Sequence, residues 1–106
     1  MFARVVEFTP VSGAAIDFVN VVEETALRLV KVQAGCIGAF VHSVGRRVIG
    51  VSLWESSSAA DRYQRVYCPA ILAMLRPYLA AEPKVYLFSM MVIGHEKSVF
   101  GQRRLG

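Results

Sequence analysis

The sequence predicts an α+β domain in which a four-stranded antiparallel sheet carries two helical regions on one face, in the order β-α-β-β-α-β. Three observations support this. Four short runs are rich in β-branched and aromatic residues. One longer stretch repeats apolar residues at helical spacing and a second begins with a helix-capping pattern, and turn-forming residues separate these segments. The length of 106 residues fits a single domain.

The first strand and the first helical region are predicted between residues 2 and 35. A β-rich run over 2–9 is followed by a proline, Ser12 is a candidate helix N-cap, and Gly35 is a candidate helix stop. Between them, apolar residues at three- and four-residue spacing form one stripe, which predicts a single helix. The stripe comprises Ala15, Phe18, Val19, Val22, Ala26, Leu29 and Val30.

The second helical region is predicted over 57–81. Ser58 with Asp61 three residues later fits a capping box, and Asp61 also suits the first turn of a helix. Pro69 is expected to interrupt this region, because the residue before a proline avoids helical geometry.

The other three strands are predicted over 36–44, 46–55 and 84–94, with a Gly-Arg hairpin turn between the first two. The last of them is apolar on both faces, since Tyr86 and Phe88 alternate with apolar neighbours. Leaving roughly 400 Å² of such a face in water would forgo about 10 kcal/mol. We therefore predict that the uncovered face packs against a second copy of the chain, as a homodimer.

Composition narrows the classes of partner. Apolar residues make up 55% of the chain and charged residues 19%, with a net charge of +4. Residues 95–106 hold three basic residues and one acidic residue, so a basic tail with a net charge of +2 follows a nearly balanced domain over 1–94. This pattern does not predict a nucleic-acid-binding groove.

A membrane-spanning segment is not expected, because no apolar run approaches the ~20 residues that a spanning helix needs. The N-terminus lacks the pattern of a signal peptide. Cys36 and Cys68 form no CxxC motif, so neither a disulfide framework nor a zinc site is predicted. We expect two free thiols in a cytoplasmic protein.

Two motifs carry a resemblance to a known family. The chain resembles the dimeric α/β-barrel proteins over residues 2–94, and within them the antibiotic-biosynthesis-monooxygenase-like branch. QAGCIGAFV (33–41) is similar to that branch's Q-P-G-F segment, with Ala34 in place of the usual proline and Cys36 where an aromatic residue is common. SLWESSSAADRY (52–63) is similar to its strand-ending W-E-S and the helix that follows.

The resemblance implies a ferredoxin-like fold whose subunits pair sheet to sheet, with ligand sites between each subunit's sheet and its helices. It also implies two known activities, cofactor-independent oxygenation of phenolic polyketides and oxidative haem degradation, although many members have no assigned activity. The haem-degrading members use an asparagine on the first strand, a tryptophan at the end of the third strand, and a histidine on the second helix. Here Trp54 matches, but the single asparagine is Asn20 and 57–81 has no histidine. Haem degradation is not expected, and no cofactor is predicted.

Four residues are candidates for binding a substrate: Trp54, Arg4, Tyr63 and Tyr67. Each has an alternative structural role. Trp54 and the two tyrosines, one helical turn apart, could be core residues. The guanidinium of Arg4, among apolar neighbours on the first strand, could form an ion pair with Glu7, Glu55 or a carboxylate on a helix.

No catalytic set can be identified from the sequence. His42 and His95 have no carboxylate or cysteine at the spacing of a metal site or a catalytic pair. Two functions therefore stay open. One is a small homodimeric monooxygenase-like enzyme with an apolar pocket for a small aromatic molecule, and the other is a non-catalytic binding or dimerisation module of the same fold.

Overall fold

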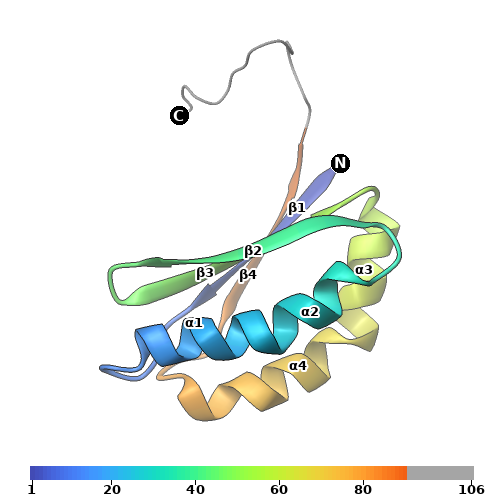
Figure 1. Ribbon diagram of the computed structural model, residues 1–106. Coiled ribbons are helices and arrows are strands. Elements are labelled where there is room, and N and C mark those ends of the chain that lie inside the picture. Colours follow the sequence, from blue (N-terminus) through green and yellow to red (C-terminus); the bar gives the residue numbers. More distant parts are fainter. Residues whose placement is uncertain (91–106) are drawn as a thin grey trace.

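The computed structural model describes residues 1–90 and confirms the predicted fold, with the helices on one face of the sheet (Figure 1). The predicted extension of the last strand beyond residue 90, together with His95 and the rest of the tail, lies outside the described residues. In chain order the elements are β1 (Phe2–Phe8), α1 (Ala15–Glu24), α2 (Ala26–Lys31), β2 (Cys36–Val44), β3 (Arg47–Trp54), α3 (Ser57–Val66), α4 (Cys68–Leu75), the 3₁₀ turn η1 (Arg76–Tyr78) and β4 (Lys84–Ser89).

The sheet has the strand order β2-β3-β1-β4, and all neighbouring strands are antiparallel. Each helical crossover passes over one strand, so the ferredoxin-like arrangement places β1 and β3 in the centre. Val5 in β1 accordingly pairs with Val51 in β3 and with Tyr86 in β4. The predicted hairpin between β2 and β3 is present, and Gly45 closes it at φ 61°.

The first helical region is two helices, and the prediction of a single helix is wrong. Thr25 lies between α1 and α2 with φ −118° and ψ −75°, and its hydroxyl donates a hydrogen bond to the Val21 carbonyl. Threonine back-bonding of this kind bends helices, which accounts for the break. Ser12 is not the N-cap either, because Ala14 occupies that position and no side chain caps this end of α1.

The predicted apolar stripe largely survives the break. Phe18, Val22, Ala26 and Val30, spaced by four residues, are all buried against the sheet. Leu29 was predicted to join them, yet it is 46% exposed. One residue is about 100° around a helix, so a side chain next to Val30 lies on the flank of the stripe.

The second helical region is also divided, as Pro69 predicted. α3 ends at Val66, and α4 has the proline in its first turn, where a missing N–H is tolerated. The cap differs from the prediction, because the Ser56 hydroxyl, and not that of Ser58, accepts a hydrogen bond from a backbone N–H in the first turn. Asp61 instead pairs with Arg65 one helical turn later, at 2.9 Å.

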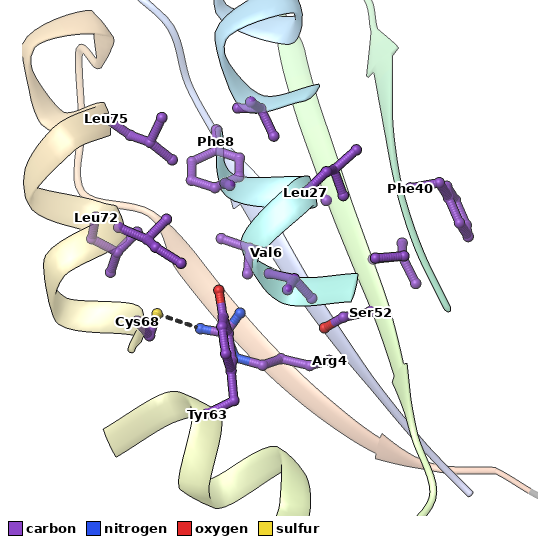
Figure 2. Close-up of a pocket in the computed structure, with 17 residues that line it drawn as sticks. Arg4, Val6, Phe8, Leu27, Phe40, Ser52, Tyr63, Cys68, Leu72 and Leu75 are labelled. Atoms are coloured by element: carbon purple, nitrogen blue, oxygen red, sulfur yellow. Dashed lines mark hydrogen bonds between the residues drawn. The ribbon is translucent and has the colours of Figure 1, made fainter. Parts of the chain in front are cut away.

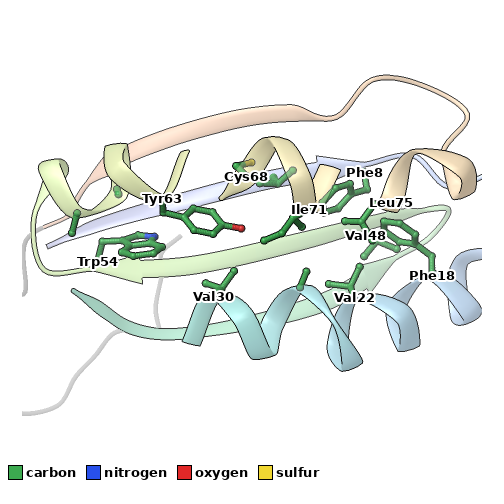
Figure 3. Packing of buried hydrophobic residues seen from close by; sticks show 14 residues of the cluster. Phe8, Phe18, Val22, Val30, Val48, Trp54, Tyr63, Cys68, Ile71 and Leu75 are labelled. Atoms are coloured by element: carbon green, nitrogen blue, oxygen red, sulfur yellow. The ribbon is translucent and has the colours of Figure 1, made fainter. Parts of the chain in front are cut away.

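One apolar core lies between the sheet and the helices (Figure 3). At one end the Phe8 and Phe18 rings meet edge to face, with centroids 5.1 Å apart. At the other end the Trp54 and Tyr63 rings stack, with centroids 5.3 Å apart. The core therefore spans the length of β1 and β3.

No helix of residues 1–90 lies on the opposite face of the sheet (Figure 1). Large apolar side chains are nevertheless exposed there, because alternate residues of the edge strands β2 and β4 point to this side. They are Phe40 (53% exposed), Val44 (55%), Tyr86 (44%) and Phe88 (52%). We call these four residues, with Ile49, Val51 and Leu53 between them on β3, the open sheet face.

Candidate functional site

Arg4 is a charged residue buried between the sheet and the helices. It lies on β1 between Phe2 and Val6, faces the helices, and is only 5% exposed. The ion pair that was one sequence interpretation of Arg4 is absent within residues 1–90. Glu7 faces the other side of the strand and pairs with Arg47 at 2.6 Å, because alternate side chains of a strand point to opposite faces.

Three residues of the second helical region contact the Arg4 guanidinium, and Figure 2 shows two of them, Tyr63 and Cys68. Its Nε donates to Gln64 Oε1 at 2.7 Å, and one terminal nitrogen donates to Cys68 Sγ at 2.8 Å. The ring of Tyr63 lies over it, with 5.1 Å between the guanidinium carbon and the ring centroid. A cation–π contact and two hydrogen bonds thus hold a desolvated cation.

Tyr63 is the second polar group of the site and is 4% exposed. Burial raises the pKa of its phenol to about 12; the neighbouring Cys68 also raises it, and the Arg4 charge partly opposes them. The hydroxyl points into the space between the sheet and α4 (Figure 2). At neutral pH Tyr63 is therefore a hydrogen-bond donor and not a base.

Trp54 and Tyr67 flank Tyr63 on its two sides. Trp54 is fully buried, and its Nε1 donates to Ser52 Oγ at 2.9 Å. Tyr67 is 41% exposed and stacks on Tyr63 with a centroid distance of 6.4 Å. The structure thus brings Arg4, Tyr63 and Trp54 together in one layer, with Tyr67 at the surface.

A small cavity lies between the sheet and the helices. Its volume is about 50 Å³, and its lining is apolar apart from Arg4, Ser52, Tyr63 and Cys68. Trp54 does not line it directly but supports two residues that do. Small-molecule pockets usually measure about 300–1,000 Å³, so this cavity is too small for an aromatic ring in the conformation described.

A shallow groove of about 150 Å³ adjoins this cavity between α3 and β4. We call it the α3–β4 groove. Arg4 lines both spaces, and is therefore the wall that they share. The residues lining the groove are Arg4, Ala60, Asp61, Gln64, Val85 and Leu87. A larger hollow of about 250 Å³ lies elsewhere, at the loop after β1, and holds no buried charge.

Sequence reasoning missed Gln64 and Cys68 as parts of the site. They lie one helical turn apart, at an i, i+4 spacing that places two side chains on the same side of a helical region. That spacing could have indicated that Gln64 and Cys68 lie on the same side of the helical region. It could not indicate that both contact Arg4, which lies on β1, 60 residues from Gln64 in the chain.

The side chains of residues 1–90 offer little for binding a metal ion. No group of three histidine, cysteine, aspartate or glutamate side chains in this part of the chain could hold a metal ion. His42 is exposed on the side of β2 that faces away from the helices. No helix in the same part is long and apolar enough to cross a membrane.

Comparison with known proteins identifies the fold. No family model matches the chain, and no curated protein matches its sequence. Solved structures do match. A monooxygenase from Streptomyces coelicolor in complex with the ligand nanaomycin D is 21% identical, with a TM-score of 0.71 over 91% of this chain and 92% of that one.

Two further structures extend the comparison. An antibiotic biosynthesis monooxygenase is 11% identical, with a TM-score of 0.70 over 87% of this chain and 100% of the other. A Nitrosomonas europaea protein of unknown function is 15% identical, with a TM-score of 0.68 over 92% and 95% of the two chains. The chain therefore has the ferredoxin-like fold of the antibiotic biosynthesis monooxygenase structures.

Proposed function

We propose that this protein is a homodimeric, monooxygenase-like protein that binds a small aromatic molecule between its sheet and its helices. The observation that carries the proposal is the layer formed by Arg4, Tyr63 and Trp54, in which a buried cation and a buried phenol face an apolar space. Ligand sites usually combine such apolar walls with a few fixed polar groups. The nanaomycin D complex of the Streptomyces coelicolor monooxygenase, which shares the fold, supports the same kind of ligand.

A ligand larger than one ring would require the two spaces on either side of Arg4 to join. The cavity of about 50 Å³ holds no ring, whereas the α3–β4 groove of about 150 Å³ is open to solvent on one side. An engineered protein cavity of roughly 150 Å³ accommodates benzene. We therefore propose that a ligand enters through the α3–β4 groove and contacts Arg4 there.

Catalysis and simple binding differ in what they require of the site. Oxygenation without a cofactor needs a group that accepts a phenolic proton from the substrate. Tyr63, with a pKa of about 12, is protonated and does not supply that base at neutral pH. This observation favours the second candidate, a non-catalytic protein that binds the same ligands.

The homodimer is proposed from the open sheet face. Four large apolar side chains exposed on one surface, with three more on the strand between them, make a patch that monomeric proteins rarely leave in water. A second copy of the chain could cover it face to face. The free thiols Cys36 and Cys68 suit a reducing compartment, and we propose the cytoplasm.

Fluorescence titration tests the binding proposal, because Trp54 is the single tryptophan and lies against Tyr63. Hydroxynaphthoquinones should quench its emission with saturation, at micromolar to millimolar dissociation constants. Free N-acetyltryptophanamide titrated in parallel is the control for inner-filter effects, and Trp54→Phe is the control for emission that does not come from Trp54. A linear, non-saturating response to a broad panel of aromatic compounds would contradict the proposal.

Oxygen uptake separates the two candidate functions. A monooxygenase should consume dioxygen when a ligand identified by quenching is added, and it should form an oxidised product detectable by mass spectrometry. Saturable binding with no oxygen uptake above that of buffer would support the non-catalytic protein.

A further inference from the structure

Arg4 is a buried cation whose charge no carboxylate balances in the described part of the chain. Arg4 is 5% exposed, and the three ion pairs found within residues 1–90 all use other arginines. An arginine cannot shed its proton to escape this situation, as a buried lysine can. A buried charge is normally paired, because taking it out of water without a counter-charge is costly.

The hydrogen-bonding capacity of Arg4 is also only partly used. A guanidinium has five N–H donors, of which one binds Gln64 and one binds the Cys68 sulfur. The remaining three have no acceptor among residues 1–90. Donors are therefore left for a further acceptor, and a carboxylate is the group that accepts two parallel hydrogen bonds from a guanidinium.

The α3–β4 groove provides space next to Arg4, which is one of its lining residues. Its walls are apolar where β4 contributes Val85 and Leu87, which are 41% and 52% exposed because the helices do not cover this edge strand. Asp61 lines the groove too, and its carboxylate forms an exposed ion pair with Arg65 at 2.9 Å. The groove thus combines one unbalanced positive charge with an apolar side, and its volume of about 150 Å³ suits one aromatic ring.

We propose that the α3–β4 groove binds a small aromatic or aliphatic monocarboxylate, with Arg4 as its anion-binding group. A monocarboxylate fits because one guanidinium balances one negative charge, and apolar contacts with Val85 and Leu87 hold the remainder of the molecule. The inference deepens the proposed function, on which it rests, by assigning a charge to the ligand and a place to its charged end.

The test compares two ligands of the same shape, benzoate and benzamide, by NMR-detected titration at pH 7. The wild-type protein should bind benzoate at least about tenfold more tightly than benzamide, because charge-assisted bidentate hydrogen bonds are stronger than hydrogen bonds to a neutral amide. Arg4→Gln should lower benzoate affinity by about tenfold or more and leave benzamide affinity within about twofold. Arg4→Lys should retain part of the preference, since it keeps the charge and loses the planar fork.

Two matched controls fix the residue and the place. Arg47→Gln removes an exposed arginine from the same sheet and should leave both affinities unchanged. Leu87→Trp fills the groove and should weaken both ligands. Val66→Trp, which substitutes an α3 residue of similar exposure (56%) that does not line the groove, should not.

The outcomes separate this inference from the proposed function. Equal binding of benzoate and benzamide to the wild-type protein would overturn the carboxylate assignment and leave an aromatic pocket standing. Binding of neither, with no quenching by any aromatic compound, would overturn both. The wild-type comparison needs no variant, so it decides the matter even if Arg4→Gln does not fold.

Discussion

At the scale of single residues, the site depends on where strand alternation and burial place a few polar side chains. Arg4 lies beneath the helices, whereas Glu7, three positions later on the same strand, lies on the other face. Trp54 is held by stacking on Tyr63 and by its hydrogen bond to Ser52.

Trp54→Ala should lower the free energy of unfolding by about 3–5 kcal/mol, the range for removing a large buried aromatic side chain. Part of this loss comes from the cavity that remains, and part from the Ser52 hydroxyl, which loses its donor. Urea unfolding followed by circular dichroism measures the change. In the wild-type protein Trp54 emission should be blue-shifted and should move to the red on unfolding. A loss below about 1 kcal/mol would show that the site relaxes around the deletion.

Tyr63 should make stability fall as the pH rises between about 10 and 12. Burial raises its pKa to about 12 in the folded protein, while the unfolded chain has the ordinary value near 10. In that window the unfolded state has lost the phenolic proton and the folded state keeps it, so rising pH favours unfolding by about 1.4 kcal/mol per pH unit from this group.

Tyr63→Phe should remove this contribution, and Tyr67→Phe is the control because Tyr67 is partly exposed. Tyrosinate absorbance near 295 nm should show one late-titrating phenol that is absent only in Tyr63→Phe. Complete ionisation of all tyrosines by about pH 11 would contradict the assignment.

At the scale of elements, short-range contacts decide where each helix begins and how it meets its strand. The break at Thr25 and the Ser56 cap both depend on single hydroxyls, which compete with or complete the helical hydrogen bonds. The turn between α2 and β2 has a different constraint. Gly35 adopts φ 86°, and its α-carbon lies directly against α3.

Gly35→Ala should therefore be more destabilising than Gly13→Ala. Both glycines have positive φ, at 86° and 81°, so both alanine variants carry backbone strain of about 1–2 kcal/mol. A β-carbon at Gly35 would also lie 2.5 Å from the Ala59 β-carbon, whereas one at Gly13 would have nothing within 4 Å. Thermal and chemical denaturation of the two variants measure the difference, which isolates the clash from the strain. Equal losses would mean that α3 shifts away freely.

At the scale of the complete fold, the sheet has two apolar faces, and the helices of residues 1–90 cover one of them. The helix-covered face contains the core, and the open sheet face presents Phe40, Val44, Tyr86 and Phe88 to solvent in a single chain. A stable interface of standard size buries about 1,600 Å² in total. A four-stranded sheet face is broad enough to provide such an area.

Val51→Asp should abolish the folded protein and not yield a soluble monomer. Val51 lies at the centre of the open sheet face, paired with Phe40 and with Val5, where a buried unpaired carboxylate would be costly. Light scattering with circular dichroism measures assembly and folding together. Val66→Asp, on the exposed side of α3, is the control and should remain dimeric. A folded wild-type monomer at micromolar concentration would contradict the homodimer.

The order of strands and helices, the two-faced sheet and the buried stripe of the first helical region could be predicted from the sequence. These features depend on the periodicity of apolar residues and on turn-forming residues, which are local properties of the chain. The hairpin at Gly45 and the interruption at Pro69 were predictable for the same reason, since both residues restrict the backbone whatever surrounds them.

Three features of the candidate site depend on how distant segments pack: the partners of Arg4, the separation of Trp54 from the cavity lining, and the α3–β4 groove. Gln64 and Cys68 are 60 and 64 positions from Arg4, and they reach it because the second crossover places α3 and α4 over β1. Composition offered several carboxylates as partners for this arginine. Glu7 lies on the opposite face because side chains alternate along a strand. The groups that contact the Arg4 guanidinium are an amide, a thiol and an aromatic ring. Such choices depend on distances between segments far apart in the chain, which no local pattern encodes.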